Sequence, residues 1–377
     1  MADASTPVSP KRKKLLFADV ASDFEKALLA SVLPDITSGR AGFVAVGIDM
    51  AAQEDNWGVS VITIDEGLSR GSLRLLLPHR FDLDGYKKKH PVKPSGAFIA
   101  QLVSGLIEHR IPAAVAVDVP FGWPQEHSSF LEAWSAVPVQ GVAISPPSRS
   151  CFEYRLCDRA MMRLLKQEGR AAAVLAVGAD KIASAAFQWA IQRVGLPGFG
   201  QVDVGHDPPV GGEVVYFETY PSALVRLNYP SFAGYKTLKE TKEGGKAAHD
   251  QPAERQARHD LLDAIRGEYC IDTTHCVSAL EAACATSASD AFDGFLSAIT
   301  AWDYLKWRTR QAGTVRMSSP TELLGPRTAA AEKARIEKEG WFLVRLPIST
   351  VGLHDDVGEQ EPQNDGRARV ESTRGEG

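Results

Sequence analysis

Three short apolar runs of this chain close on a carboxylate, and this feature constrains the fold more than any other. Their length and β-branched content predict buried strands. Ligands of an open sheet bind outside the carboxyl ends of its parallel strands, so acids at these positions are expected to converge at one edge. The runs cover residues 42–49, 113–118 and 213–220, and the acids are Asp49, Asp118 and Glu218.

The order of the predicted elements indicates an α/β fold. Alternating residues at 57–64 and an apolar run at 73–81 predict an antiparallel meander with the first strand. A helical pattern at 95–109 then leads into the buried run at 113–118, which requires a mixed sheet with a crossover connection. We therefore expect a mixed five-stranded sheet flanked by helices. Further helices are predicted at 158–169, 180–194, 255–267 and 289–310, and a last strand at 341–346.

The chain is predicted to form one domain, because its composition does not change between residues 40 and 350. This domain is expected over 41–350, with a long insertion at 119–157 that is rich in proline, serine and aromatic residues. A polar, basic tail and a leading helix are expected over 1–40. Residues 351–377 have few apolar anchors, which predicts a disordered tail.

Composition and charge exclude several classes of protein. A hydrophobic fraction of 44% and a charged fraction of 24% exclude a collagen-like or wholly disordered chain. The net charge of −5 gives no general attraction for nucleic acid, so such a partner needs a local basic patch. There is no long uncharged apolar run and no signal-peptide pattern, so we expect no membrane contact and a cytoplasmic location.

A fourth acidic element opens the helix expected at 289–310. Asp290 and Asp293 have the i, i+3 spacing that places both on one helix face. Carboxylates that gather at one edge repel each other unless cations lie between them, and Mg²⁺ prefers such hard oxygen ligands. Two such ions about 4 Å apart are the usual device for phosphodiester hydrolysis. The alternative for each acid alone is a helix cap or a solvated turn.

Several motifs together resemble an uncharacterised family, domain of unknown function 429, described as predicted nucleases of the RNase H fold. The resemblance implies that fold here, with Mg²⁺ or Mn²⁺ bound by acids on the first strand, the fourth strand and a late helix. Asp49, Asp118 and the pair Asp290 and Asp293 match those places, and Glu218, in a further motif of the family, is an additional candidate metal ligand. The motifs are residues 46–51, 115–124, 155–158, 217–221, 235–236, 290–293 and 339–341.

Substrate contacts are predicted from basic residues near these motifs. Arg149 and Arg155, next to Asp158, could hold a phosphate, because a guanidinium fits phosphate oxygens bidentately. The alternative is an internal pair between arginine and aspartate. Lys236 begins a lysine-rich loop that could contact phosphate or lie in solvent.

The predicted function is a divalent-metal-dependent nuclease that hydrolyses DNA or RNA by a two-metal mechanism. One alternative is a phosphotransferase of the sugar-kinase and actin superfamily, which needs a glycine-rich phosphate loop after its first strand. Here Met-Ala-Ala-Gln follows Asp49 instead. Another alternative is a non-catalytic module that binds nucleic acid or a protein partner, although such a module gains nothing from anions that face phosphates.

Overall fold

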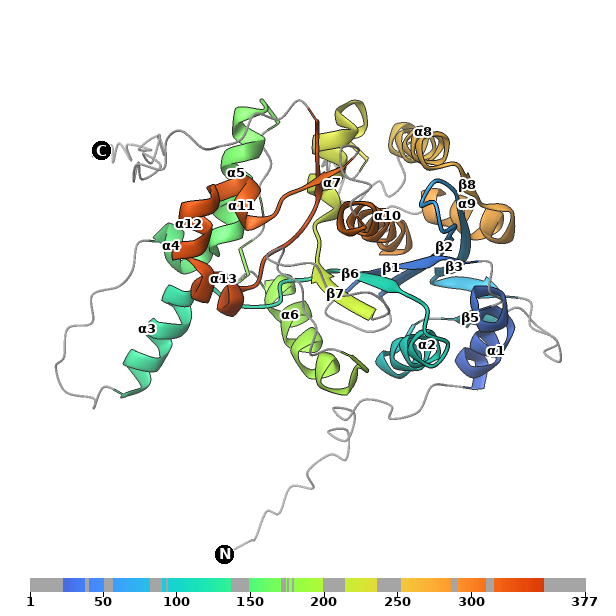
Figure 1. Ribbon diagram of the computed structural model, residues 1–377, viewed down its shortest axis with the longest axis horizontal. Coiled ribbons are helices and arrows are strands. Elements are labelled where there is room, and N and C mark those ends of the chain that lie inside the picture. The colour runs from blue at the N-terminus through green and yellow to red at the C-terminus, as the bar shows by residue number, and fades with distance from the viewer. Residues whose placement is uncertain are drawn as a thin grey trace, which may run out of the picture.

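A mixed sheet forms the centre of the computed structural model (Figure 1). The structure describes residues 23–37, 41–50, 57–81, 90–92, 94–136, 149–170, 174, 176–177, 180–198, 214–235, 252–285, 290–309 and 315–348. The six strands of the sheet lie in the order β7-β6-β1-β2-β3-β8. Their bounds are Phe43–Asp49 (β1), Gly58–Ile64 (β2), Gly71–Leu77 (β3), Ala113–Asp118 (β6), Val214–Glu218 (β7) and Ile271–Asp272 (β8).

The strand pairing confirms the predicted mixed sheet, while the predicted strand count was wrong. β1, β2 and β3 form the antiparallel meander, and β6 pairs with β1 and with β7 in parallel. The sixth strand, β8, adds parallel to β3. The run expected at 73–81 divides after Leu77, and its remainder forms a separate two-stranded sheet of β4 (His79–Phe81) and β5 (His90–Val92). The run at 341–346 contributes β10 (Arg345–Leu346), which pairs with β9 (Arg316–Met317).

Helices cover both faces of the sheet and its β7 edge (Figure 1). One face carries α7 (Pro221–Asn228), α8 (Pro252–Tyr269), α9 (Val277–Ala285) and α10 (Asp290–Arg308). The opposite face carries α1 (Asp23–Thr37), α2 (Gly96–Glu108) and α6 (Asp180–Gln192). A lateral group lies beside β7 and consists of α3 (Gln125–Ala136), α4 (Arg149–Glu153), α5 (Leu156–Gln167), α11 (Pro320–Leu324), α12 (Pro326–Ala331) and α13 (Lys333–Glu339). Short 3₁₀ turns are η3 (Arg193–Gly195), η4 (Pro230–Phe232) and η5 (Thr274–Cys276).

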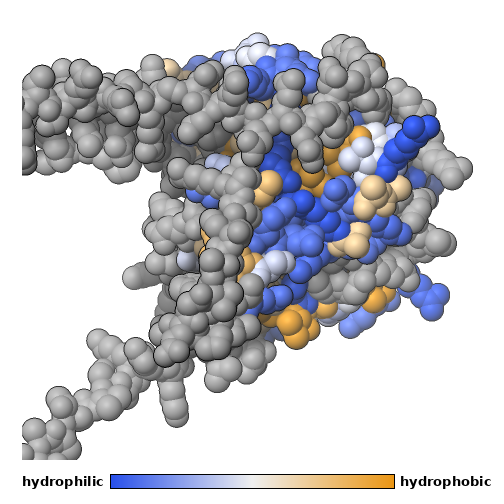
Figure 2. Space-filling model, turned by 90° about the vertical axis from the view of Figure 1, so that its left-hand side faces the viewer, coloured by the Kyte–Doolittle hydropathy of each residue, from blue (hydrophilic) through white to orange (hydrophobic). Residues whose placement is uncertain are grey.

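The insertion expected at 119–157 is partly helical. It contributes α3 and α4 to the lateral group, whose described surface is mainly hydrophilic (Figure 2). The predicted helices at 158–169, 180–194, 255–267 and 289–310 correspond to α5, α6, α8 and α10. Residues 1–22 and 349–377, on which the predicted tails depend, lie outside the described part. No helix within the described ranges is long and apolar enough to cross a membrane.

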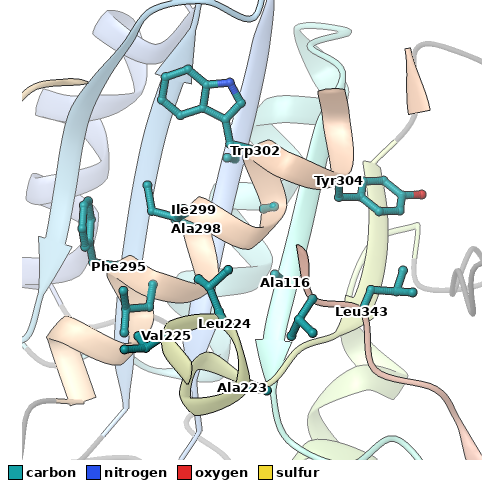
Figure 3. Packing of buried hydrophobic residues seen from close by; sticks show 14 of the residues in the cluster. Ala116, Ala223, Leu224, Val225, Phe295, Ala298, Ile299, Trp302, Tyr304 and Leu343 are labelled. Carbon is teal, nitrogen blue, oxygen red and sulfur yellow. The ribbon is translucent and has the colours of Figure 1, made fainter. Parts of the chain in front are cut away.

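Small residues on one face of the sheet allow α10 to lie directly against the strands. On that face β1 presents Ala45 and Gly47, and β6 presents Ala114 and Ala116, whereas most alternate positions of the two strands hold valine or isoleucine. A Cβ atom on Gly47 would lie 2.0 Å from the carbonyl oxygen of Gly294. The backbone of α10 therefore touches the backbone of the sheet at Gly47. Figure 3 shows α10 lying across the strands. This contact fixes where the acidic first turn of α10 lies.

Gly47→Ala is expected to lower the free energy of unfolding by about 1–3 kcal/mol or more, because the new methyl group must displace α10 from the sheet. Gly267→Ala is the matched control. Gly267 lies inside α8 with open space around it, so alanine there should stabilise the protein by about 0.5–1 kcal/mol. Urea unfolding measures both changes. Equal stability of the Gly47→Ala variant and the wild type would contradict this close contact.

Arg345 connects β10 to the helices above the sheet. Its guanidinium forms an ion pair with Glu268 of α8 and lies 5.6 Å from the ring centroids of Tyr229 and Tyr269. Burial opposes the charge of Glu268, but hydrogen bonds from Arg345 and Tyr229 outweigh it and lower the pKa of this carboxyl below its ordinary value. The ionised form of Glu268 therefore stabilises the fold.

The contribution of Glu268 should depend on pH in a defined direction. Because its folded-state pKa lies below the ordinary value of 4.5, the stabilisation is complete above that pH and is lost as the pH falls through the folded-state pKa. We expect the difference in unfolding free energy between wild type and Glu268→Gln to shrink as the pH falls below about 4.5. Urea titrations at several pH values test this, and a difference that widens on acidification would contradict it.

Candidate active site

Asp49 and Asp118 lie side by side at the carboxyl end of the sheet. The parallel register of β1 and β6 pairs the two residues directly. Neighbouring strands are about 4.8 Å apart, so the two side chains leave the sheet as close neighbours. Both residues are partly exposed, whereas every earlier residue of β6 is buried. The predicted convergence of the first two acids is therefore present.

The alternation of side chains places both carboxylates on the α10 face. Ala116, two residues before Asp118, belongs to the same core cluster as α10, and so does Ala45, four residues before Asp49 in β1. Val117 points to the opposite core. Since successive side chains of a strand point to opposite faces, Asp49 and Asp118 continue the α10 face.

The first turn of α10 reaches the same corner of the sheet. Gly58 pairs with Asp49 across β1 and β2, and a Cβ atom on Gly58 would lie 1.8 Å from the carbonyl oxygen of Asp290. Asp293 is buried, and its Oδ1 accepts a hydrogen bond from the Tyr235 hydroxyl at 3.1 Å. The positive end of the helix dipole thus lies near Asp49, which favours anionic groups there.

Asp49, Asp118 and the first turn of α10 together form what we call the acidic corner. Its side chains alone do not make a complete metal-binding site. Among the described residues, no three histidine, cysteine, aspartate or glutamate side chains are grouped closely enough to hold a metal ion. Mg²⁺, however, is usually bound through one or two carboxylates, with water and substrate phosphates completing the octahedron. The adjacent carboxylates of Asp49 and Asp118 fit that mode of binding. The roles predicted for Asp290 and Asp293 remain predictions.

Glu218 ends β7 at the same carboxyl edge of the sheet, as predicted, but on the face opposite to that of Asp49 and Asp118. It follows Tyr216 on the face opposite α10. Its Oε2 accepts hydrogen bonds from Arg155 Nη1 at 2.7 Å and from the Phe121 amide at 3.0 Å, and Arg155 Nη2 lies 2.5 Å from its Oε1. Both oxygens are thus engaged inside the protein.

Arg155 and Asp158 form the internal pair that was the alternative to substrate binding. Arg155 is 2% exposed, and its Nε and Nη2 contact the two Asp158 carboxylate oxygens at 3.1 and 3.0 Å. Burial opposes the charge on Arg155, but the carboxylates of Asp158 and Glu218 raise its pKa well above the ordinary value. The structure therefore forms the internal pair, and substrate binding by Arg155 and Asp158 remains a prediction.

The other two predicted substrate residues have no described side chain. Arg149 begins α4, but its side chain lies outside the described part, and Lys236 falls in the undescribed range 236–251. Their predicted contacts with phosphate remain predictions.

Glu339 is buried and holds the loop that follows Asp118. The sequence indicated no role for it. The Glu339 carboxylate accepts hydrogen bonds from the amides of Gln125 at 2.7 Å and Leu156 at 2.6 Å, which are the first residues of α3 and α5. A Cβ atom on Gly122 would lie 2.5 Å from the Lys338 carbonyl oxygen. The Glu-Gly-Trp motif was visible in the sequence, but its partners, more than 180 residues earlier in the chain, were not.

Fold and site together define an α/β protein with a mixed central sheet and two neighbouring aspartates at its carboxyl edge. The chain belongs to the family described as Protein of unknown function (DUF429), whose model matches residues 47–316. The match begins two residues before Asp49 and includes Asp118, Glu218 and the acidic turn of α10. No curated protein and no solved structure matches the chain.

Proposed function

We propose that this protein is a divalent-metal-dependent nuclease with an RNase H-like arrangement of its site. The observation that carries the proposal is the direct pairing of Asp49 with Asp118 on the face covered by α10. The strand order supports it, because β1 lies in the middle of the sheet, the antiparallel meander extends to one side and β6 pairs on the other. This places one acid on the first strand, one on the strand after the crossover and two on a late helix.

The chain itself contributes position and charge to the reaction. Asp49 and Asp118 would hold Mg²⁺ or Mn²⁺, and α10 brings Asp290 to the same edge of the sheet. When bound, such cations activate water and stabilise the leaving oxygen of a phosphodiester. Partial exposure of the two strand aspartates leaves the corner accessible to a phosphate backbone.

Incubation of the purified protein with a panel of DNA and RNA substrates tests this proposal. The panel should contain single strands, duplexes, hybrids and branched junctions. We expect cleavage of at least one substrate with Mn²⁺ or Mg²⁺ and none with a chelator. Intact substrates throughout, at saturating Mn²⁺, would contradict nuclease activity.

A further inference from the structure

Thr219, the residue after Glu218, lies beside Asp118 on the face of the sheet that carries α10. Phe217 stacks on Tyr304 of α10 with ring centroids 4.5 Å apart, so its side chain points to that face. Alternation then directs Glu218 away from α10 and Thr219 toward it. In the register of β6 and β7, Val117 pairs with Glu218, the last residue of β7. The hydrogen bond from the Thr219 amide to the Val117 carbonyl continues the parallel ladder by one residue, which sets Thr219 level with Asp118.

The backbone on both sides of this position is fixed. The Thr219 amide donates a hydrogen bond to the Val117 carbonyl at 2.9 Å, and the Glu218 carbonyl accepts one from the Leu343 amide at 2.7 Å. The ion pair of Glu218 with Arg155 holds the strand from the opposite face. These contacts therefore fix the backbone from which the Thr219 side chain projects.

The hydroxyl of Thr219 is buried and, within the described residues, makes no hydrogen bond. The residue is 2% exposed. A buried hydroxyl without a partner is costly, and such groups are rare in folded proteins. Packing alone does not explain the hydroxyl, because valine has the same shape without this cost. An acceptor that becomes available when the site is occupied does explain it.

We infer that Thr219 is a positioning residue for Asp118, an inference that rests on the proposed metal-dependent function. Its hydroxyl donates a hydrogen bond to the Asp118 carboxylate when that group binds a divalent cation, and so fixes the direction of the ligand oxygen. Hydrogen bonds to metal ligands from neighbouring residues typically change metal affinity by 10–100-fold. Within the motif at residues 217–221, the side chain assigned to the acidic corner is thus Thr219 rather than Glu218.

Isothermal titration of the full chain with Mn²⁺, combined with thermal unfolding, tests this role. We expect Thr219→Val to bind Mn²⁺ about 10–100-fold more weakly than wild type. Its melting temperature without metal should equal or exceed that of wild type, because no hydrogen bond is lost. Thr219→Ser keeps the hydroxyl and should bind Mn²⁺ like wild type, although it loses a buried methyl group and melts earlier.

The outcomes separate this inference from the proposed function. If wild type binds Mn²⁺, Asp118→Asn does not and Thr219→Val binds like wild type, the role of Thr219 is overturned while the proposed function stands. Weaker binding by Thr219→Val that accompanies a lower melting temperature, or equal weakening by Thr219→Ser, indicates a structural role and also overturns the inference. Absence of Mn²⁺ binding by wild type overturns both proposals.

Discussion

Replacement of Arg155 by methionine is expected to lower the free energy of unfolding by about 3–5 kcal/mol, because it leaves buried carboxylates without their cation. Asp158 and Glu218 are 1% and 3% exposed, and both contact the Arg155 guanidinium. Methionine fills much of the same volume, so the loss reports the charge rather than a cavity. Chemical denaturation at neutral pH measures the change.

Arg327→Met is the matched control for this prediction. Arg327 is exposed on α12, so the same substitution removes one positive charge without exposing a buried partner. Its effect should stay within about 0.5 kcal/mol. Similar losses in the two variants would show that Arg155 does not neutralise buried carboxylates, and would favour the prediction that it binds substrate.

Replacement of Asp118 by asparagine is expected to reduce metal-dependent cleavage by about 1000-fold. Loss of a carboxylate ligand removes several kcal/mol of stabilisation from the transition state, and about 1.4 kcal/mol corresponds to a factor of ten. Without metal, the variant should be at least as stable as wild type, because like charges directly opposite on neighbouring strands are destabilising. Asp49→Asn should behave in the same way. Rate measurements and thermal unfolding test the two effects.

A substitution that lowers activity without lowering stability indicates a functional carboxylate, whereas a loss of both indicates a structural one. Asp263→Asn provides the control, because Asp263 is exposed on α8 and forms a surface ion pair with Arg266. It should leave both cleavage and stability close to wild type. If Asp118→Asn lowered the melting temperature and the activity together, its carboxylate would be a structural group instead.

The two central acids could be predicted from the sequence because local patterns determine their positions. A short apolar run that ends in aspartate indicates both the strand and its carboxyl edge, as at Asp49 and Asp118. The helix at 290–308 follows from its long apolar pattern, and its acidic first turn from the i, i+3 spacing of Asp290 and Asp293. Each of these predictions can be made from residues that are close together in the sequence.

The face of the sheet to which Glu218 points could not be predicted, because β7 is buried on both faces. All five of its residues are buried, so its hydrophobic pattern does not show which face a given side chain occupies. The choice depends on Arg155, which lies 63 residues earlier in the chain. For the same reason an internal pair and a phosphate contact remained equal alternatives for Arg155. The sixth strand has only two residues, too few for a detectable alternation.

A crystal structure of the protein with Mn²⁺ tests the central claim most directly, through the anomalous scattering of the metal. We expect a Mn²⁺ ion within about 2.1 Å of a carboxylate oxygen from both Asp49 and Asp118, beside the first turn of α10. An ion held by other residues, or an empty corner between these two aspartates at saturating Mn²⁺, would contradict it.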